Sequence, residues 1–221
     1  MIIAVAHSKG GTGKTTVALQ LALYRKLIDR RDVWLVDSDE QQSALTATSI
    51  RSNSGMEVPV LPCSSFTDGS TLMTQVQEQA KKWDDVVIDV GGRVTDTMRA
   101  AMMLCDVMVI PVPPRSFDVW AVSKLESIRK SAMSFGANFR TLVFISCADA
   151  QPGIENEIVR EQIEAKEGYE FLDCQVVRRK AIATASGNGL SVFEFKPRDM
   201  KACAEIEALA KAVFRDLGED E

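Results

Sequence analysis

The sequence predicts an α/β protein built as a mainly parallel, twisted sheet with helices on both faces. Short apolar runs alternate along the chain with longer segments whose apolar residues recur every three or four positions. The short runs are almost continuously apolar, as in strands that are covered on both faces. The chain has 221 residues, with no internal repeat or linker-like stretch, so we expect one domain over residues 1–221.

Seven apolar runs of strand length are the expected strands. They are residues 2–6, 33–36, 58–61, 86–88, 107–110, 141–146 and 171–177. The fifth run is followed by Pro111-Val112-Pro113-Pro114. Because proline has no N–H to donate to a sheet, we expect this strand to end at residue 110.

Helices are expected between these strands and at the end of the chain. They cover residues 15–28, a segment starting near 42, and residues 70–83, 98–104, 117–135, 154–166 and 200–217. Residues 178–189 are basic, then small and polar, and receive no assignment. The last helix has apolar residues at i, i+3 and i+4 spacing, which are Ile206, Leu209, Ala210, Val213, Phe214 and Leu217. We expect it to pack in the core rather than on a membrane, since the chain ends acidic and anionic lipid repels acidic segments.

The composition is that of an ordinary globular protein, with 46% apolar, 26% charged and 6% aromatic residues. A net charge of −5 argues against a surface that coats nucleic acid all round, although a local basic patch fits within it. The five cysteines form no C-x-x-C pair, so neither a zinc site nor an iron–sulfur cluster is indicated. With no signal peptide and no apolar run long enough for a bilayer, we expect a cytoplasmic protein.

The segment between the first strand and the first helix has the composition of a phosphate-binding loop. It reads His7-Ser8-Lys9-Gly10-Gly11-Thr12-Gly13-Lys14-Thr15-Thr16. Glycines allow backbone N–H groups to turn inward around an anion, and the helix N-terminus adds partial positive charge. In such loops the lysine, here Lys14, contacts the β- and γ-phosphates, and the hydroxyl of Thr15 binds Mg²⁺. The residues expected to bind nucleotide are Gly10, Gly11, Thr12, Gly13, Lys14, Thr15 and Thr16.

The loop departs from the common G-x-x-x-x-G-K-S/T pattern in one informative way. Ser8 stands where that pattern has its first glycine, and an additional lysine, Lys9, precedes Gly10. The form K-G-G-T-G-K-T-T resembles the deviant Walker A motif of the ParA/MinD family of ATPases. The resemblance implies a P-loop NTPase fold, ATP and Mg²⁺ as cofactors, and a homodimer that forms in ATP. It also implies that Lys9 reaches across the dimer interface to the partner's nucleotide; taken alone, Lys9 would be interpreted as a solvated loop lysine.

Three aspartates follow directly after predicted strands, at the sheet edge where ligands of such folds bind. Asp89 closes the run 86–88 and looks like a Walker B aspartate, which holds Mg²⁺ directly or through water. The alternative is a strand-end aspartate that caps a turn. Asp37 and Asp39 resemble the family's D-x-D-P-Q segment, with Glu40 in place of the proline. The resemblance implies that Asp39 orients the attacking water, while Asp37 supports Asp39 or the magnesium shell.

Further segments resemble the short plasmid-partition ParA proteins, of which ParF is one. They are Pro111-Val112-Pro113-Pro114 and Gly189-Leu190-Ser191-Val192-Phe193-Glu194. This resemblance implies slow, partner-stimulated ATP hydrolysis, non-specific binding to nucleoid DNA, and a ParB-like centromere-binding protein or cargo adaptor as partner. Operator binding is not expected, because the chain lacks the N-terminal DNA-reading extension of longer ParA proteins. After Asp89, Gly91 and Gly92 form a flexible turn suited to sensing a γ-phosphate. Arg93 is interpreted as a surface arginine, with a switch residue as the alternative.

The expected DNA-binding residues are Arg178, Arg179 and Lys180, with Lys196, Arg198 and Lys201 shortly after them. A solvated charged face is the alternative for this cluster. For the protein as a whole, the alternatives are a MinD-like division-site or organelle-positioning ATPase and a P-loop metabolic ligase, for which no second substrate motif is found. Relatives of the nitrogenase iron protein and of tyrosine kinases are disfavoured, because suitably placed cysteines and a tyrosine-rich tail are missing.

Overall fold

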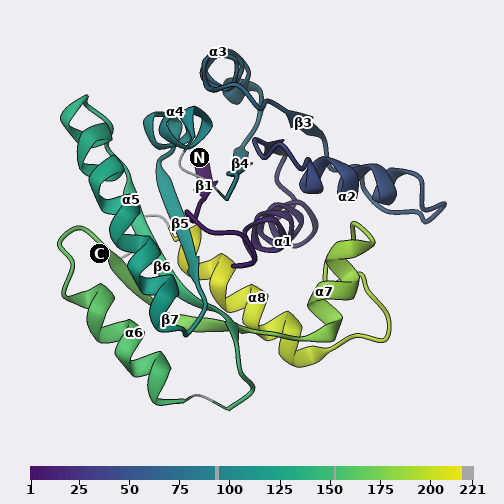
Figure 1. Cartoon of the computed structure of the whole chain (residues 1–221). Coiled ribbons are helices and arrows are strands. Elements are labelled where there is room, and N and C mark those ends of the chain that lie inside the picture. The colour runs from purple at the N-terminus through teal and green to yellow at the C-terminus, as the bar shows by residue number, and fades with distance from the viewer. Residues whose placement is uncertain (93–94, 152, 216–221) are drawn as a thin grey trace, which may run out of the picture.

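A parallel sheet forms the centre of the molecule (Figure 1). The computed structural model describes residues 1–92, 95–151 and 153–215, without the side chains of residues 116–121. Within these residues seven strands form one sheet in the order β3-β2-β4-β1-β5-β6-β7, and all neighbouring strands are parallel. The strands are β1 (Ile2–Val5), β2 (Val33–Asp37), β3 (Cys63–Ser65), β4 (Asp85–Asp89), β5 (Val107–Val112), β6 (Arg140–Ala148) and β7 (Glu170–Val177). The predicted parallel α/β architecture is confirmed.

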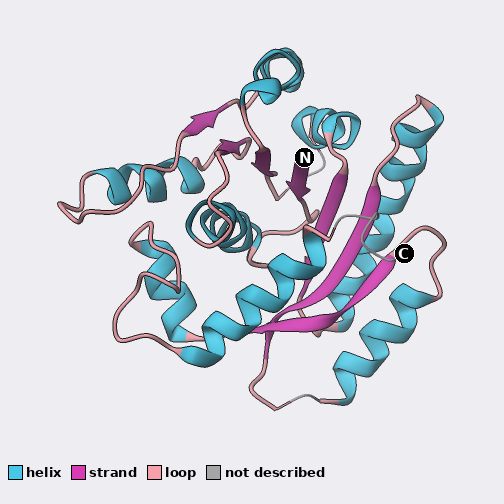
Figure 2. Ribbon diagram, turned by 180° about the vertical axis from the view of Figure 1, so that it is seen from behind, coloured by secondary structure: helices cyan, strands magenta, loops and turns pink. Residues whose placement is uncertain are grey.

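Helices cover both faces of the sheet, as Figures 1 and 2 show from opposite sides. One face carries α1 (Lys14–Leu27), α2 (Ser43–Ser52), α7 (Lys180–Gly187) and α8 (Met200–Val213). The other carries α3 (Gly69–Gln79), α4 (Asp96–Leu104), α5 (Ser116–Ser134) and α6 (Ile154–Glu164). Successive strand residues point to opposite faces, so Ile3 and Val5 enter one core while Ala4 and Ala6 enter the other. This is why the strands are almost continuously apolar.

The last helix packs in the core, as expected. Ile206, Leu209, Ala210 and Val213 of α8 are all fully buried, and the helix covers β7 and α1. The helix ends at Val213, and the predicted end at residue 217 lies outside the described residues. Across the part of the chain that the structure describes, no helix is long and apolar enough to cross a membrane.

The prediction of the third strand was wrong. Residues 58–61 form no strand, and β3 begins at Cys63, which is the sheet partner of Leu35. Pro59 has no N–H to donate, and Val60 is 64% exposed, so this apolar run does not offer the sheet a buried face. Because β3 is an edge strand whose residues are only half-buried, polar side chains suffice there.

The predicted end of the fifth strand was also wrong, because β5 continues through Pro111 to Val112. The carbonyl of Val109 accepts a hydrogen bond from the N–H of Ala6, and the pairing of β5 with β1 ends there. Residues two apart in a strand face the same neighbour, so the N–H that Pro111 lacks would point toward β1, beyond the end of that pairing. On its other side β5 stays paired with β6 through Val112.

The unassigned residues after β7 form a helix. Helix α7 spans Lys180–Gly187 and begins directly after Arg179, its N-cap residue. The predicted helix over 70–83 is shorter than expected: α3 ends at Gln79 and a 3-10 turn covers Ala80–Lys82.

Candidate functional site

The phosphate-loop segment connects β1 to α1 at the carboxyl end of the sheet. Gly11 and Gly13 have φ angles of 76° and 92°, in the left-handed region where a side chain would be strained. Gly13 is the N-cap of α1, and no side chain caps this helix end. A Cβ at Gly10 or Gly11 would meet nothing within 4 Å, so the loop has an open side. Uncapped backbone N–H groups at a helix N-terminus beside open space are a suitable arrangement for binding phosphate.

Lys14 lies inside this loop, with only 6% of its surface exposed. Its Nζ donates a hydrogen bond to the carbonyl of Lys9 at 2.9 Å. Burial lowers the pKa of Lys14, and the negative charges of Asp89 and Asp39 act in the opposite direction. The sequence pattern therefore correctly placed these two aspartates near the loop lysine. Lys9 itself is half-exposed.

Asp89, the last residue of β4, is a buried carboxylate beside the Thr15 hydroxyl. It is 1% exposed, and among the described residues neither of its side-chain oxygens has a hydrogen-bond partner. Burial raises the pKa of Asp89 to about 7, while the nearby Thr15 hydroxyl and Lys14 oppose the increase. Buried carboxylates are rarely left unpaired, so Asp89 fits a residue that binds a cation beside the loop.

The pKa of Asp89 predicts how the nucleotide-free and Mg²⁺-free protein responds to pH. The native state binds this proton more tightly than an unfolded chain, where the pKa is near 3.8. The free energy of unfolding should therefore fall as the pH rises from about 4 to 7, by up to about 4 kcal/mol. Asp89→Asn should melt at a higher temperature than the wild type at pH 8, and the difference should shrink below pH 5. Calorimetry without nucleotide or metal tests this; an equal difference at both pH values would contradict it.

Asp37 and Asp39 occupy different positions, although they are two residues apart. Asp37 is fully buried, and its two oxygens accept the N–H groups of Asp39 at 3.0 Å and Leu45 at 2.9 Å. Burial raises the pKa of Asp37, and these backbone hydrogen bonds lower it. Asp37 thus ties the loop after β2 to the first turn of α2. Asp39 is half-buried and accepts the N–H of Gln41 at 3.0 Å, in a turn where Glu40 takes the place of the expected proline.

A cleft of about 340 Å³ joins Asp39 to the phosphate loop. Its lining includes Gly10, Ser38, Asp39, Glu40, Gln41, Thr67, Gly91, Gly92, Thr95, Asp96 and Thr97. A Cβ on Gly92 would lie 3.2 Å from the nitrogen of Gly10 and 3.3 Å from Nζ of Lys14. The turn after β4 therefore packs directly against the phosphate loop, as a turn that responds to a γ-phosphate requires. Arg93 lies outside the described residues.

Two side chains that the sequence did not single out for this site also support the loop. Nδ1 of the buried His7 accepts the N–H of Lys9 at 3.1 Å. The Ser146 hydroxyl at the end of β6 donates to the carbonyl of Thr12 at 2.9 Å, and it lies 3.0 Å from where a Cβ of Gly13 would stand. His7 has a recognisable signal, because it is the only histidine and lies beside the motif. Ser146 has none, because only the sheet brings it there.

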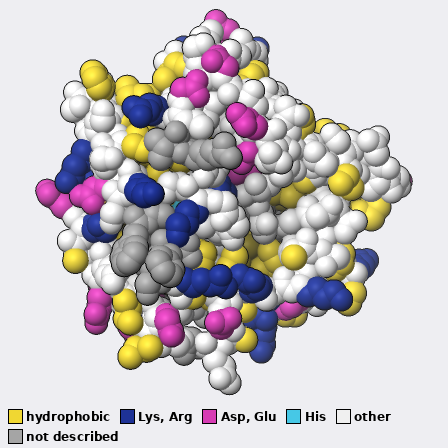
Figure 3. All heavy atoms as spheres, in the orientation of Figure 1, with side chains coloured by type: hydrophobic (Ala, Val, Ile, Leu, Met, Phe, Trp, Pro, Cys, Tyr) yellow, Lys and Arg dark blue, Asp and Glu magenta, His cyan; other side chains and the backbone are white. Residues whose placement is uncertain are grey.

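In the predicted basic cluster Arg179 is half-buried, whereas the other members are exposed, including Lys196, Arg198 and Lys201. Arg178 and Lys180 are exposed at the start of α7. Arg179 between them forms an ion pair with Glu205 of α8, with nitrogen–oxygen distances of 2.6 and 2.9 Å. Arg198 donates to the carbonyl of Phe193 at 2.6 Å. Figure 3 shows basic side chains on the face of the molecule seen in Figure 1, with acidic ones among them.

Comparison with known proteins gives a family, relatives and structural neighbours. The model of a family described as CobQ/CobB/MinD/ParA nucleotide binding domain matches residues 3–192. The maintenance of carboxysome distribution protein A of Halothiobacillus neapolitanus is 27% identical over 214 residues, covering 96% of this chain and 95% of that protein. Protein ParA of Rhizobium radiobacter is 26% identical over 227 residues, covering 99% and 98%.

Two solved structures illustrate the shared fold. A variant of McdA from Cyanothece, in complex with ATP, superposes with a TM-score of 0.77 at 14% identity and covers 96% of this chain and 95% of its own. The septum site-determining protein MinD of Pyrococcus horikoshii, complexed with Mg-ADP, superposes with a TM-score of 0.72 at 18% identity and covers 97% and 96%. At these identities the neighbours confirm the fold of the chain.

Proposed function

Because the chain belongs to the CobQ/CobB/MinD/ParA nucleotide-binding family, we propose that it is a Mg²⁺-dependent ATPase for partition or positioning of a cargo. The proposal rests mainly on one observation. The buried carboxylate of Asp89, which lies beside the Thr15 hydroxyl, and the half-buried Asp39 lie close enough to Lys14 to perturb its pKa, at an uncapped helix N-terminus. This arrangement would place hydrogen-bond donors beside a γ-phosphate, a carboxylate ligand beside its metal ion, and a second carboxylate beside the attacking water.

In this proposal the backbone N–H groups of residues 10–16 and the ammonium of Lys14 bind the phosphates. The Thr15 hydroxyl and Asp89 hold Mg²⁺, which would neutralise phosphate charge when bound. Mg²⁺ in nucleotide sites is commonly held by one or two protein groups together with water and phosphate oxygens. The Thr15 hydroxyl and Asp89 would therefore be enough protein ligands. Asp39 orients the attacking water. Both oxygens of Asp37 accept backbone N–H groups, which favours support of Asp39 over a place in the magnesium shell.

The proposal further includes a homodimer that forms in ATP. Lys9 is half-exposed in the phosphate loop, and in this proposal it contacts the nucleotide of the second copy. Hydrolysis would then be slow without a ParB-like centromere-binding protein or cargo adaptor, and would separate the dimer. We place the protein in the cytoplasm on nucleoid DNA.

An organelle-positioning ATPase is the second candidate, and one specific observation favours it. Two relatives carry the name maintenance of carboxysome distribution protein A, at 27% and 26% identity over nearly the whole chain. Others are named ParA and the chromosome-partitioning ATPase Soj. Plasmid, chromosome and organelle thus all stand as candidate cargoes, and the same ATP-driven cycle would serve each of them.

DNA binding that depends on ATP but not on sequence is the test of this proposal. Wild-type protein should bind unrelated duplexes equally in ATP and far more weakly in ADP. In a dimer the basic patches of the two subunits would bind the same DNA duplex. The second DNA contact is then intramolecular, which raises the affinity for DNA about a hundredfold or more. Affinity should fall steeply with salt, with a slope of about −0.9 for each phosphate neutralised. Fluorescence anisotropy over a salt series measures both.

The exposed pair Arg178 and Lys180 gives the matched variants for this test. The double variant Arg178→Ala/Lys180→Ala should weaken binding to all sequences alike and flatten the salt slope, leaving ATP hydrolysis without DNA intact. The control Lys81→Ala/Lys82→Ala removes two exposed lysines just before the start of β4, at the amino end of that strand. It should change neither the DNA affinity nor the salt slope. No binding by the wild type in ATP at low salt, or strong preference for one sequence, would refute the DNA-based mechanism.

A further inference from the structure

The segment Gly189-Leu190-Ser191-Val192-Phe193-Glu194, called the connector below, follows α7 and is held by helix α1. Gln20, fully buried in α1, uses its whole amide group to bind the connector and the end of α7. Its Nε2 donates to the Ser186 hydroxyl at 3.0 Å and to the carbonyl of Leu190 at 2.9 Å, while its Oε1 accepts the N–H of Val192 at 3.0 Å. The helix that begins at the phosphate loop thus fixes the position of the connector.

A buried ion pair joins the connector to helix α2. Arg51, near the end of α2, is 1% exposed, and its two terminal nitrogens each donate to one oxygen of Glu194 at 2.7 Å. Nε of Arg51 donates to the carbonyl of Pro59 at 2.9 Å, and one terminal nitrogen also donates to Gly189 at 3.1 Å. A planar, bidentate pair of this kind fixes orientation as well as distance.

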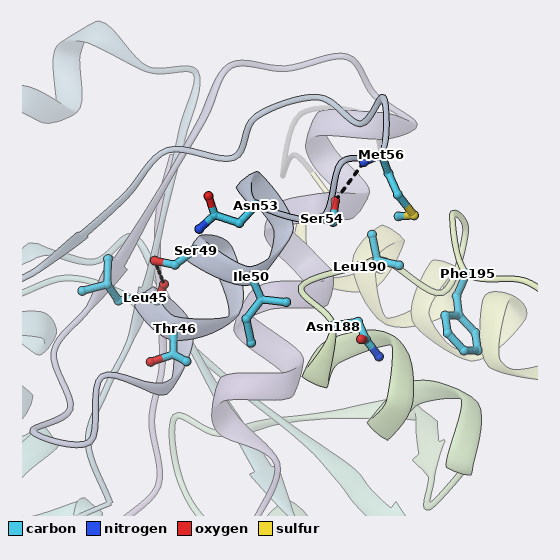
Figure 4. Close-up of a pocket in the computed structure, with 10 residues that line it drawn as sticks. All are labelled: Leu45, Thr46, Ser49, Ile50, Asn53, Ser54, Met56, Asn188, Leu190 and Phe195. Carbon is cyan, nitrogen blue, oxygen red and sulfur yellow. Dashed lines mark hydrogen bonds between the residues drawn. The ribbon is translucent and has the colours of Figure 1, made fainter.

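Apart from the contacts that α2 makes with the connector, a groove separates α2 from α7. A groove of about 760 Å³ runs between them, lined by Leu45, Thr46, Ser49, Ile50, Asn53, Ser54, Met56, Asn188, Leu190 and Phe195 (Figure 4). A second groove of about 600 Å³ continues toward Thr15 and Thr16. The connector touches α2 closely at Gly189, where a Cβ would lie 2.1 Å from the carbonyl oxygen of Ala47. Helix α2 also packs against α1, β2 and β3, and on the side that faces α7 it is held by the Arg51–Glu194 pair and by the contact at Gly189.

The other end of α2 is attached to the proposed catalytic loop. The N–H of Leu45, in the first turn of α2, donates to Asp37, whose other oxygen accepts the N–H of Asp39. A helix moves largely as a rigid rod, because its own hydrogen bonds hold its backbone. A shift at Arg51 would therefore move Leu45, and with it the bonds through which Asp37 positions Asp39.

We propose that Arg51 and Glu194 are positioning residues for ATP hydrolysis: they hold α2 in the orientation in which Asp37 fixes Asp39 at the γ-phosphate. This inference rests on the proposed ATPase function, and it gives the connector a role in the reaction. Neither residue contacts the phosphate loop, so their removal should lower the rate of hydrolysis and leave nucleotide affinity in place.

The test uses the double variant Arg51→Met/Glu194→Leu, because removing one partner alone would leave a buried charge and strongly destabilise the protein. We expect kcat to fall about tenfold or more, as for a small displacement of a catalytic group. The Kd for ATP should stay within about twofold. Amide hydrogen exchange without nucleotide should become faster in residues 43–52 and stay unchanged in residues 14–27. The control Arg140→Met/Glu170→Leu removes an ion pair of 2.8 Å at the opposite edge of the sheet and should keep the wild-type kcat.

Each outcome decides one question. The inference is overturned if the double variant keeps the wild-type kcat or shows unchanged hydrogen exchange in α2. It is also overturned if the ATP affinity falls together with kcat. Wild-type protein that hydrolyses no ATP overturns the proposed function, and the exchange experiment, which needs no nucleotide, still reports whether the pair tethers α2.

Discussion

Replacing Lys14 with alanine is expected to abolish Mg-ATP binding, with affinity reduced at least a hundredfold. The Lys14 ammonium is buried within the loop and held by the carbonyl of Lys9, so it is placed to bring a fixed positive charge to the phosphates. Hydrogen bonds to charged groups are worth about 1.5–3 kcal/mol, and 1.4 kcal/mol corresponds to a factor of about ten in affinity. Isothermal titration calorimetry with ATP, with and without Mg²⁺, measures the loss.

Two controls separate lost chemistry from lost structure. Lys14→Met keeps most of the side-chain volume and should bind as weakly as Lys14→Ala, while both variants keep the folded circular dichroism spectrum. Lys130→Ala removes a lysine that is 66% exposed and should bind ATP normally. A Lys14→Met variant with near wild-type affinity would show that the loop is not the phosphate site.

Asp39→Ala and Lys9→Ala are expected to have opposite effects on the dimer. Asp39→Ala should bind ATP and dimerise but lose hydrolysis by about a hundredfold or more, because the carboxylate that orients water is gone while the N–H bond from residue 39 to Asp37 remains. Lys9→Ala should keep part of its ATP affinity and stay monomeric, because the ammonium that bridges to the second nucleotide is missing. Light scattering in ATP and in ADP, together with phosphate release, measures both.

The wild type provides the reference for this pair. It should be monomeric in ADP and dimeric in ATP, and Lys130→Ala should behave in the same way. A wild type that stays monomeric in ATP, or that dimerises equally in both nucleotides, would argue for a metabolic ligase on the same fold. Dimerisation of Lys9→Ala in ATP as strong as that of the wild type would remove the cross-interface role of this lysine.

The sequence by itself determined the fold class and the family resemblance, and it led to the proposed site. Lys9, Lys14 and Thr15 lie within one strand–loop–helix unit, so their geometry follows from local spacing. Asp37 and Asp89 each end a strand, and the register of β2 with β4 sets them side by side. Because every strand of a parallel sheet ends at the same edge, residues that follow strands come together wherever they lie in the chain.

The tertiary structure alone decided what these residues are bonded to. Nothing in the sequence pairs Arg51 with Glu194, Arg179 with Glu205, or Ser146 with the phosphate loop. The partners stand 143, 26 and 134 residues apart along the chain. Hydrophobic periodicity reports which face of an element is buried, whereas a polar side chain is satisfied by whichever donor or acceptor the packed elements bring to it. The motifs of the proposed site could therefore be found in the sequence, whereas the hydrogen bonds that support them are seen only in the fold.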